Sequence, residues 1–373
     1  MVGTVLQEPA HAARHWHRLD DGRVQCDLCP RNCRVHEGKR GVCFVREVKD
    51  GELVTDSYGR ASGFMIDPIE KKPLFHFLPG TPVLSFGTMG CNLTCAFCQN
   101  WKISRSHDLQ TLGDAATPEQ IAAAAVQLGC RSVAFTYNEP IIFHEYAVDV
   151  AKACHAVGVK TIAVTAGYQN AAPRAEFYEH IDAANIDLKA FTDRFYREIC
   201  GGHLEPVLET IEYVHRETKA WLELTTLLIP GENDSDSEIQ DECSWIAGHL
   251  GPNVPVHFTA FHPDWRMRNR IATPYSVLSR ARRIARATGL HFVYTGNVHD
   301  IEGSSTYCAA CNLELIERNG YEIDHSDLTD DGHCRRCATR LPGLFEGQPG
   351  HWGARFESVT IGTAAPTENH EDT

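Results

Sequence analysis

The sequence lacks three features that define large classes of proteins. Its longest aliphatic run covers only residues 121–126, far short of the roughly 18 apolar residues that a membrane-spanning helix needs. The first 16 residues contain no apolar stretch of the kind that a signal peptide requires. With 35 basic against 49 acidic residues, the chain has no excess of positive charge for binding phosphates. We therefore expect a cytoplasmic protein with no membrane span and no nucleic-acid partner.

Cysteine, by contrast, is abundant, with 15 residues in a chain of 373. Eleven of these cysteines fall into three tight groups, while Cys130, Cys154, Cys200 and Cys243 stand alone. A cytoplasmic chain of this length can bury a sizeable core without disulfide bonds. Grouped cysteines then indicate metal sites. The four single cysteines are interpreted as small buried apolar side chains.

The middle of the chain alternates short β-branched runs with longer amphipathic segments. The short runs are almost continuously apolar, which is typical of parallel strands covered on both faces. Six or seven such repeats predict a partial or complete (β/α) barrel, with a doubly wound sheet as the competing architecture. The expected strands are 83–86, 132–136, 161–165, 185–188, 221–228, 256–261 and 292–295, and the expected helices are 118–128, 142–156, 174–180, 204–217, 238–250 and 274–288.

Cys91, Cys95 and Cys98 form a C-x3-C-x2-C motif directly after the first expected strand. This position places three thiols on a loop at the C-terminal mouth of the barrel, where such folds keep their active sites. Thiolates suit iron–sulfur clusters, and a four-iron cube held by three cysteines leaves one iron open to a substrate or cofactor. The alternative is a zinc site completed by His76 or His107, which has no need of this loop position.

With Phe97 as its aromatic residue, the motif C-x3-C-x-aromatic-C resembles the signature of the radical S-adenosylmethionine (SAM) enzymes. Residues 70–80 and 98–101 resemble one branch, the AmmeMemoRadiSam system radical SAM enzymes, which are related to pyruvate formate-lyase activating enzyme. The likeness extends from about residue 26 to residue 345. It implies a [4Fe-4S] cluster on Cys91, Cys95 and Cys98. It also implies reductive cleavage of SAM to methionine and a 5′-deoxyadenosyl radical, which abstracts hydrogen from a substrate inside a water-poor barrel.

The resemblance also assigns cofactor contacts after the second expected strand. Glu139, with Asn138 before it, matches the place where relatives keep a motif that binds the amino group of SAM. A carboxylate can pair with an ammonium group there, and Phe97 is expected against the adenine. The competing interpretation is that Glu139 interacts with the dipole of the helix that follows it.

Three further segments are compared with the family in the same way. Asp187 and Lys189 resemble the family's Asp-Leu-Lys, with Lys189 placed to meet a carboxylate, or else they form a structural ion pair. His262 resembles a histidine near the ribose, or else it is a solvated loop residue. Residues 164–167 depart from the Asp-Thr-Asn-Gly of the activating enzymes, which argues against a monovalent-cation site. Gly167 still allows the backbone to approach the cofactor.

Two cysteine modules flank the expected barrel. Cys308-x2-Cys311 and Cys334-x2-Cys337 have the spacing of a zinc ribbon, and a rubredoxin-like iron site uses the same geometry. In the other module, four thiols within 18 residues can enclose a zinc ion or an auxiliary iron–sulfur cluster. Without a metal, such thiols would be prone to oxidation. These N-terminal thiols belong to Cys26, Cys29, Cys33 and Cys43.

We therefore predict a radical SAM enzyme in four regions: an N-terminal region with a four-cysteine module (1–82), the barrel (83–302), a zinc-ribbon-like module (303–347) and a tail (348–373). Expected cofactors are the [4Fe-4S] cluster, SAM, zinc and a possible second cluster. Expected partners are an electron donor such as a flavodoxin or ferredoxin and, by resemblance, MEMO-like and AMMECR1-domain proteins. The alternatives are a glycyl-radical enzyme activase acting on a partner protein, and a non-catalytic iron–sulfur or zinc electron-transfer protein.

Overall fold

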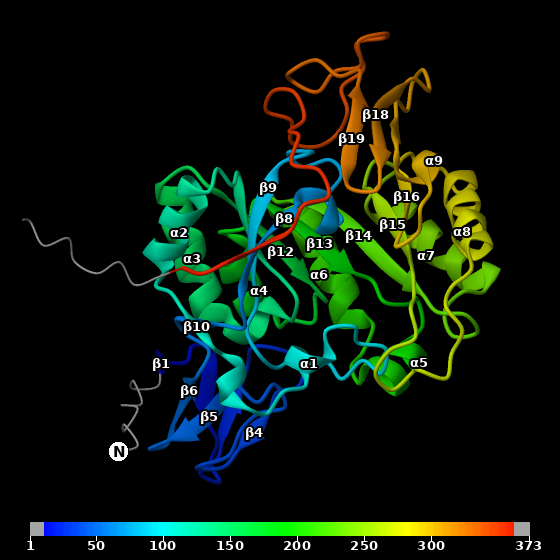
Figure 1. Ribbon diagram of the computed structural model, residues 1–373. Helices are drawn as coiled ribbons and strands as arrows, with labels where there is room; N and C mark the ends of the chain where they lie inside the picture. Colours follow the sequence, from blue (N-terminus) through cyan, green and yellow to red (C-terminus); the bar gives the residue numbers. More distant parts are fainter. Residues whose placement is uncertain (1–10, 362–373) are drawn as a thin grey trace, which may run out of the picture.

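Seven parallel strands form the centre of a nine-stranded sheet in the computed structural model, which describes residues 11–361 (Figure 1). The order is β16-β15-β14-β13-β12-β11-β9-β8-β20, and β8 and β20 are antiparallel at one edge. The strands are β8 (Phe64–Pro68), β9 (Pro82–Phe86), β11 (Ser132–Phe135), β12 (Lys160–Thr165), β13 (Ala183–Asp187), β14 (Trp221–Leu228), β15 (Val256–Ala260), β16 (Val293–Gly296) and β20 (Glu357–Val359).

The strand order distinguishes between the two expected architectures. The seven parallel strands follow one another in sequence order with no reversal, so the sheet has no switch point of the doubly wound kind. The edge strands β16 and β20 do not pair with each other, so the barrel stays open. The prediction of a partial (β/α) barrel is therefore confirmed.

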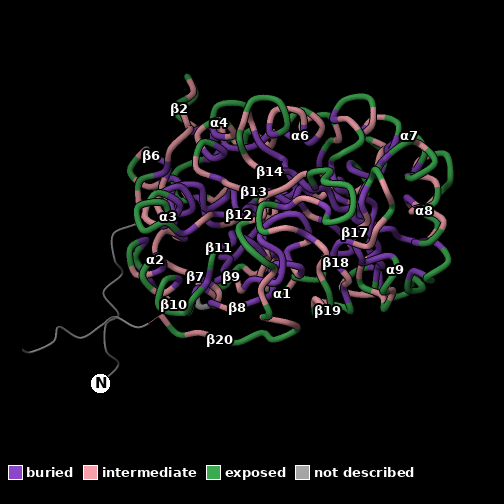
Figure 2. The backbone as a smooth tube through the Cα atoms, turned by 90° about the horizontal axis from the view of Figure 1, so that it is seen from above, coloured by how far each residue is buried: buried purple, intermediate pink, exposed green. Residues whose placement is uncertain are grey.

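Helices cover the outside of the curved sheet, and their exposed residues face away from it (Figure 2). The helix α2 begins as the sequence predicts, because Thr117 and Gln120 form a reciprocal capping box and proline occupies the first helical position. Before α3, residues Pro140–Phe143 form a 3-10 turn. The main helices are α2 (Pro118–Gln127), α3 (His144–Ala156), α4 (Ala171–Tyr178), α6 (Glu205–Glu217), α7 (Asp236–His249) and α8 (Tyr275–Ala287).

A segment before the first parallel strand, residues 69–78, fills the N-terminal end of the barrel. The Glu223 carboxylate on β14 accepts hydrogen bonds from the backbone amides of Phe75 and His76, at 3.0 and 2.7 Å. The ring of His76 contacts the Tyr294 hydroxyl on β16 at 2.6 Å. Asn185 on β13 donates to the carbonyl of Pro73 at 2.8 Å. Because this end is filled, the open space of the barrel lies at the other end of the strands.

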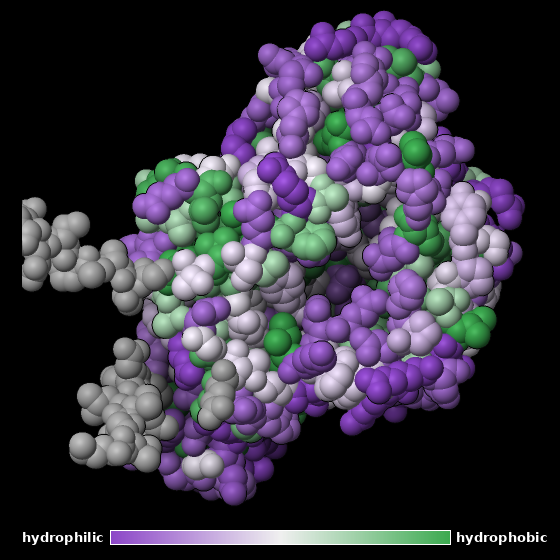
Figure 3. All heavy atoms as spheres, in the orientation of Figure 1, coloured by the Kyte–Doolittle hydropathy of each residue, from purple (hydrophilic) through white to green (hydrophobic). Residues whose placement is uncertain are grey.

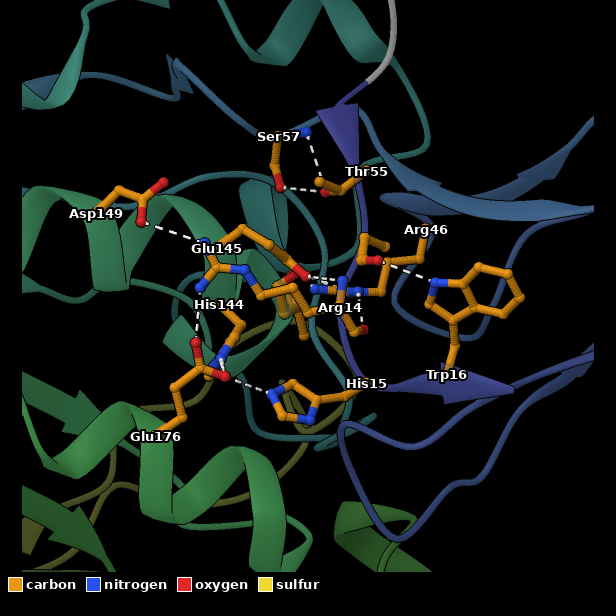
Figure 4. A network of polar contacts seen from close by, with 12 residues as sticks. Arg14, His15, Trp16, Arg46, Thr55, Ser57, His144, Glu145, Asp149 and Glu176 are labelled. Carbon is orange, nitrogen blue, oxygen red and sulfur yellow. Dashed lines mark hydrogen bonds and ion pairs between the residues drawn. The ribbon is translucent and has the colours of Figure 1, made fainter. Parts of the chain in front are cut away.

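The N-terminal module is attached to α3 and α4 by ion pairs, of which the one to α3 is buried (Figure 4). Arg46 Nη2 lies 2.5 Å from Glu145 Oε2, and both side chains are buried. Arg14 Nη1 lies 2.6 Å from Glu176 Oε1. The strands of this module are β1 (His11–Ala12), β2 (Trp16–Arg18), β3 (Val24–Cys26), β4 (Arg34–Val35), β5 (Arg46–Lys49) and β6 (Glu52–Thr55).

The C-terminal module packs on the filled end of the barrel. Its apolar residues share one core with Phe75, Phe292 and Tyr294. The buried Arg318 donates to the carbonyl of Phe75 at 2.7 Å, and its guanidinium lies 4.2 Å from the centre of that ring. Its strands are β17 (Thr306–Tyr307), β18 (Glu314–Asn319) and β19 (Glu322–Ser326). Other short elements are β7 (Arg60–Ala61), β10 (Asp114–Ala115), α1 (Trp101–Ser104), α5 (Asp193–Phe195) and α9 (Ile301–Ser304).

None of the helices in residues 11–361 combines the length and the apolar character needed to cross a membrane. Of the expected tail, the residues up to 361 contribute β20 to the sheet. Residues 362–373 lie outside the described part of the chain.

Candidate active site

A cavity opens at the C-terminal ends of the parallel strands. The surface of the molecule is hollowed near its centre in the view of Figure 3. Each of the seven parallel strands, through its last residues or the loop after it, contributes to the wall. Wall residues include Cys91, Cys95, Phe97 and Cys98 after β9, Asn138 and Glu139 after β11, Ala166 after β12, Asp187 and Lys189 at β13, Leu227, Thr259 and Asn297.

Three of these wall residues are the predicted cluster ligands. Cys95 is buried, while Cys91 and Cys98 are half-buried. Burial raises the pKa of the Cys91 and Cys98 thiols, so metal binding would have to displace their protons. Within the described residues, the three sulfurs do not form a set within 4.8 Å of one another. That spread suits a multi-iron cluster, because a single ion draws its ligands closer together.

The zinc alternative for these thiols needs a nearby histidine, and neither candidate lines the cavity. His76 lies at the filled end of the barrel, where its two ring nitrogens contact the Pro342 carbonyl and the Tyr294 hydroxyl. His107 is exposed and stacks on Phe44, with the ring centres 4.5 Å apart. The structure therefore offers an open set of three thiols rather than a closed zinc site.

Hydrogen bonds from one side chain and from the backbone hold the cysteine loop in place. The side-chain amide of Asn138 donates to the carbonyl of Gly90 at 3.0 Å and to the hydroxyl of Thr88 at 3.1 Å. On the other side, the backbone amide of Thr94 donates to the carbonyl of Cys200 at 2.8 Å. Asn138, which was predicted as a cofactor contact, is thus also the residue that fixes the start of the loop.

Glu139 is buried and points its carboxylate at the start of the loop after β12. Its Oε1 accepts from the Thr165 hydroxyl at 2.6 Å and from the Ile141 amide at 3.3 Å, and its Oε2 accepts from the Ala166 amide at 2.8 Å. Burial raises the pKa of Glu139, although these hydrogen bonds oppose the shift. A carboxylate has about four acceptor positions, so one stays available for an ammonium group. The hydrogen bond from the Ile141 amide is the contact with the start of the following helix that the competing interpretation of Glu139 predicts.

Lys189 lines the cavity together with Asp187 and Phe97. Its ammonium nitrogen is 2.9 Å from Asp187 Oδ2 and 5.9 Å from the centre of the Phe97 ring. Burial disfavours the charged lysine, but the Asp187 carboxylate outweighs it and holds the pKa of Lys189 well above its ordinary value. Lys189 is therefore a fixed positive charge beside the thiols, and the predicted ion pair with Asp187 is present as well.

Two predicted contacts do not lie in the cavity wall. His262 is exposed on the loop after β15. Gly167 lies behind Ala166 with a φ of 66°, where a Cβ atom would be 3.0 Å from Ile186. Glycine is required at this position because the backbone packs closely against the side chain of Ile186, and not because it approaches the cavity.

The sequence analysis missed a buried charge network beneath the cavity. Asp67 on β8 is within 2.5 Å of both the Lys72 ammonium and the Tyr137 hydroxyl. Burial opposes ionisation of Asp67, but the charge of Lys72 prevails and holds the pKa of Asp67 at about 2. Tyr137 lines the cavity and has a φ of 69°, which is unusual for a tyrosine. Lys72 falls in the quoted run 70–80, and this is the signal that could have drawn attention to it.

The four C-terminal cysteines converge as one compact group. Their sulfurs all lie within 4.8 Å of one another, with 3.6 Å between those of Cys308 and Cys337 and 3.7 Å between those of Cys311 and Cys334. A tetrahedral zinc ion with Zn–S bonds of about 2.3 Å separates its sulfurs by about 3.8 Å. This group could therefore hold a single metal ion.

Comparisons with known proteins agree with this geometry. Residues 86–243 match the family model described as "Radical SAM superfamily". The chain is 38% identical over 325 residues to the uncharacterized protein MJ0808 of Methanocaldococcus jannaschii, which covers 87% of this chain and 96% of that protein. The chain belongs to the radical SAM superfamily.

Other members of the radical SAM superfamily resemble parts of the chain. The 4-hydroxyphenylacetate decarboxylase activating enzyme of Clostridioides difficile is 30% identical over 131 residues, 35% of this chain and 41% of that enzyme. A domain of pyruvate-formate lyase-activating enzyme from Bacteroides vulgatus has a TM-score of 0.40 at 20% identity and covers 44% of this chain and 99% of that chain. As a radical SAM enzyme, the chain is related to the activating enzymes, and its family implies a [4Fe-4S] cluster and SAM.

Proposed function

We propose that this radical SAM enzyme is the radical SAM component of the AmmeMemoRadiSam system. In this role it cleaves SAM reductively and uses the resulting 5′-deoxyadenosyl radical to abstract hydrogen from a substrate. The observation that carries the chemistry is the open set of three thiols at the cavity mouth, facing Glu139 and Lys189. The assignment to this branch rests on the run of residues 70–80 and on the presence of both cysteine modules.

The residues of the cavity fit the two groups that the family implies. Cys91, Cys95 and Cys98 would hold three irons of a [4Fe-4S] cluster, which supplies one electron for cleavage of the sulfonium bond. Glu139 would bind the ammonium group of SAM through its remaining acceptor position. Lys189 would bind the carboxylate of SAM, with Asp187 keeping the ammonium of Lys189 in place. Gly167 and His262 stay predictions on resemblance alone.

Several apolar side chains among the wall residues support the radical chemistry. Leu93, Val164, Ala166 and Leu227 line the cavity together with Phe97. These apolar side chains help to exclude water from the part of the cavity that they line. The chain's part in hydrogen abstraction is therefore to hold the cofactor and substrate together and to keep solvent out.

The surroundings of the enzyme are proposed on the same basis. We propose a reducing, cytoplasmic setting, because all cysteines among the described residues are free and eleven serve as candidate ligands. We also propose a flavodoxin or ferredoxin as electron donor, MEMO-like and AMMECR1-domain companions, and zinc in the C-terminal module. The four regions 1–82, 83–302, 303–347 and 348–373 are proposed as units of function.

Anaerobic reconstitution with iron and sulfide tests the proposal. We expect the reduced protein to convert SAM to methionine and 5′-deoxyadenosine, and the triple variant Cys91→Ala, Cys95→Ala, Cys98→Ala to lose this activity. Cys130→Ala is the matched control, because it removes a buried thiol outside the cavity. Normal SAM cleavage by the triple variant would refute the site. Including MEMO-like and AMMECR1-domain proteins in the assay would then show which substrate is consumed.

A second candidate function is a glycyl-radical enzyme activase. The similarity to the 4-hydroxyphenylacetate decarboxylase activating enzyme favours it. An activase would generate a radical on the backbone glycine of a partner protein. Electron paramagnetic resonance of a candidate partner after incubation with the enzyme and SAM distinguishes the two functions, since only an activase leaves a stable glycyl signal.

A further inference from the structure

The N-terminal module encloses a second thiol-lined cavity, separate from the active-site cavity. All four cysteines of the module line it. Cys26, Cys29 and Cys43 are buried, and Cys33 is half-buried. Most of the remaining wall is apolar and includes Leu28, Val35, Leu53, Ile141 and Ile142. The thiols therefore face a space that is shielded from water but lies near the module surface at Cys33.

The spacing of these four sulfurs differs from that of the C-terminal group. Among the described residues, the C-terminal cysteines form a compact set within 4.8 Å, whereas no three of the N-terminal sulfurs do. A single tetrahedral ion with metal–sulfur bonds of about 2.3 Å cannot span the wider arrangement. A group that contains several irons and bridging sulfides separates its thiolates further and fills the space between them. The same chain thus carries one thiol set sized for an ion and one sized for a larger group.

Hydrogen-bond donors and a cation face this second cavity. Backbone amides donate to the sulfurs, from Leu28 to Cys26, from Arg31 to Cys29 and from Val45 to Cys43. The Nη2 atom of Arg31 is buried without a hydrogen-bond partner. Arg31 lines the cavity and forms no ion pair among the described residues. The Nη2 atom itself lies beside Gly201, where an added Cβ atom would be 3.3 Å from it.

The second cationic wall residue, Arg46, is already neutralised. Figure 4 shows its guanidinium directed at Glu145, with Nη2 2.5 Å from Oε2. Arg31 and Arg46 thus both line the cavity, and of the two only Arg46 has an ion-pair partner among the described residues.

The cavity adjoins the loop that carries the active-site cysteines. A Cβ atom on Gly90 would lie 2.0 Å from the carbonyl oxygen of Cys43, so the two backbones are in direct contact. Cys91 follows Gly90, with their Cα atoms about 3.8 Å apart. Arg31 Nε donates to the carbonyl of Asn92 at 2.8 Å, and Asn92 also lines the second cavity. One layer of backbone thus separates the two thiol sets.

We propose that Cys26, Cys29, Cys33 and Cys43 hold an iron–sulfur cluster that relays electrons to the active-site cluster. The relay half of this proposal rests on the proposed function of Cys91, Cys95 and Cys98. In each step a one-electron donor protein is oxidised, the N-terminal cluster is reduced by one electron, and that electron then passes to the active-site cluster, which returns the relay to its oxidised form. With four thiolates the relay has no open iron, so it stores an electron without binding SAM.

Acid-labile sulfide tests the cluster itself, because zinc and rubredoxin-like iron sites contain none. We expect the triple variant Cys91→Ala, Cys95→Ala, Cys98→Ala to keep about two or four sulfides per chain after anaerobic reconstitution. Adding Cys26→Ala and Cys29→Ala should remove them. The triple variant leaves the N-terminal module intact, so misfolding of that module does not confuse the result. If the triple variant contains zinc or no sulfide, the cluster proposal is overturned, while the proposed function is untouched.

SAM cleavage with two reductants tests the relay. In the Cys26→Ala, Cys29→Ala variant, cleavage driven by dithionite should stay within about twofold of the wild type, whereas cleavage driven by reduced flavodoxin or ferredoxin should fall at least about tenfold. Cys130→Ala should leave both rates unchanged. Equal loss with both reductants, or no loss with either, would overturn the relay. Failure of the wild type with both reductants would instead count against the proposed function.

Discussion

Replacing Glu139 by Gln removes the charge that we assign to recognition of the SAM ammonium group. A hydrogen bond to a charged partner contributes about 1.5–3 kcal/mol, which corresponds to an increase of about 10- to 100-fold in Kd. The glutamine oxygen can still accept from Thr165 and Ile141, but its amide cannot accept from the Ala166 backbone. The increase should therefore reach the upper part of that range.

Glu242→Gln is the matched control for this variant. Glu242 is also a buried carboxyl group that accepts from a strand threonine, since Thr226 donates to it at 2.5 Å, but it does not line the cavity. Isothermal titration of SAM into anaerobically reconstituted protein gives the two Kd values, and the visible spectrum reports whether the cluster is intact. If Glu139→Gln bound SAM as the wild type does with its cluster present, Glu139 would be a helix-end residue and the ammonium site would lie elsewhere.

Two further predictions concern stability. Cys334→Ser should lower both the metal content and the Tm of the full-length chain, because the metal site and the barrel share one core. If the metal were lost and the Tm stayed the same, packing alone would hold the C-terminal module in place. Glu242→Gln should flatten the pH dependence of the free energy of unfolding. Burial raises the pKa of Glu242 from 4.5 to about 8 in the folded protein. The contribution of Glu242 to the free energy of unfolding is therefore fully present below pH 4.5 and is lost as pH rises through about 8. Urea titrations from pH 5 to 9 measure this, and parallel curves for the two proteins would contradict the assignment.

The fold could be predicted from the sequence largely because the buried strands contain little besides apolar and β-branched residues. The prediction for β14 matches its bounds, Trp221–Leu228. The prediction for β13 began two residues late, because Ala183 and Ala184 have low intrinsic strand preference and are held in the sheet by their pairing with β14. Tertiary context, rather than local preference, decides such positions.

The candidate site was predictable only where its residues follow one another in a motif. The loop of Cys91, Cys95 and Cys98 is local, so its spacing carries the information. The contact of Tyr137 with Asp67 spans 70 positions, and that of Arg31 with the carbonyl of Asn92 spans 61. No periodicity in the sequence reports such contacts. The wide separation of the N-terminal sulfurs likewise depends on how the module folds, not on the intervals between its cysteines.

The C-terminal module packs on the filled end of the barrel, and this arrangement limits the order in which the parts of the protein can fold during synthesis. The ring of His76 contacts the carbonyl of Pro342 across 266 positions. At about 5–20 residues per second, a ribosome needs roughly 10 to 50 s to synthesise that interval. Throughout this time the segment around His76 has already emerged, while the surface that will cover it does not yet exist. The filled end of the barrel is therefore covered only when translation is nearly complete, and the cysteines of the loop at the other end have been synthesised well before then.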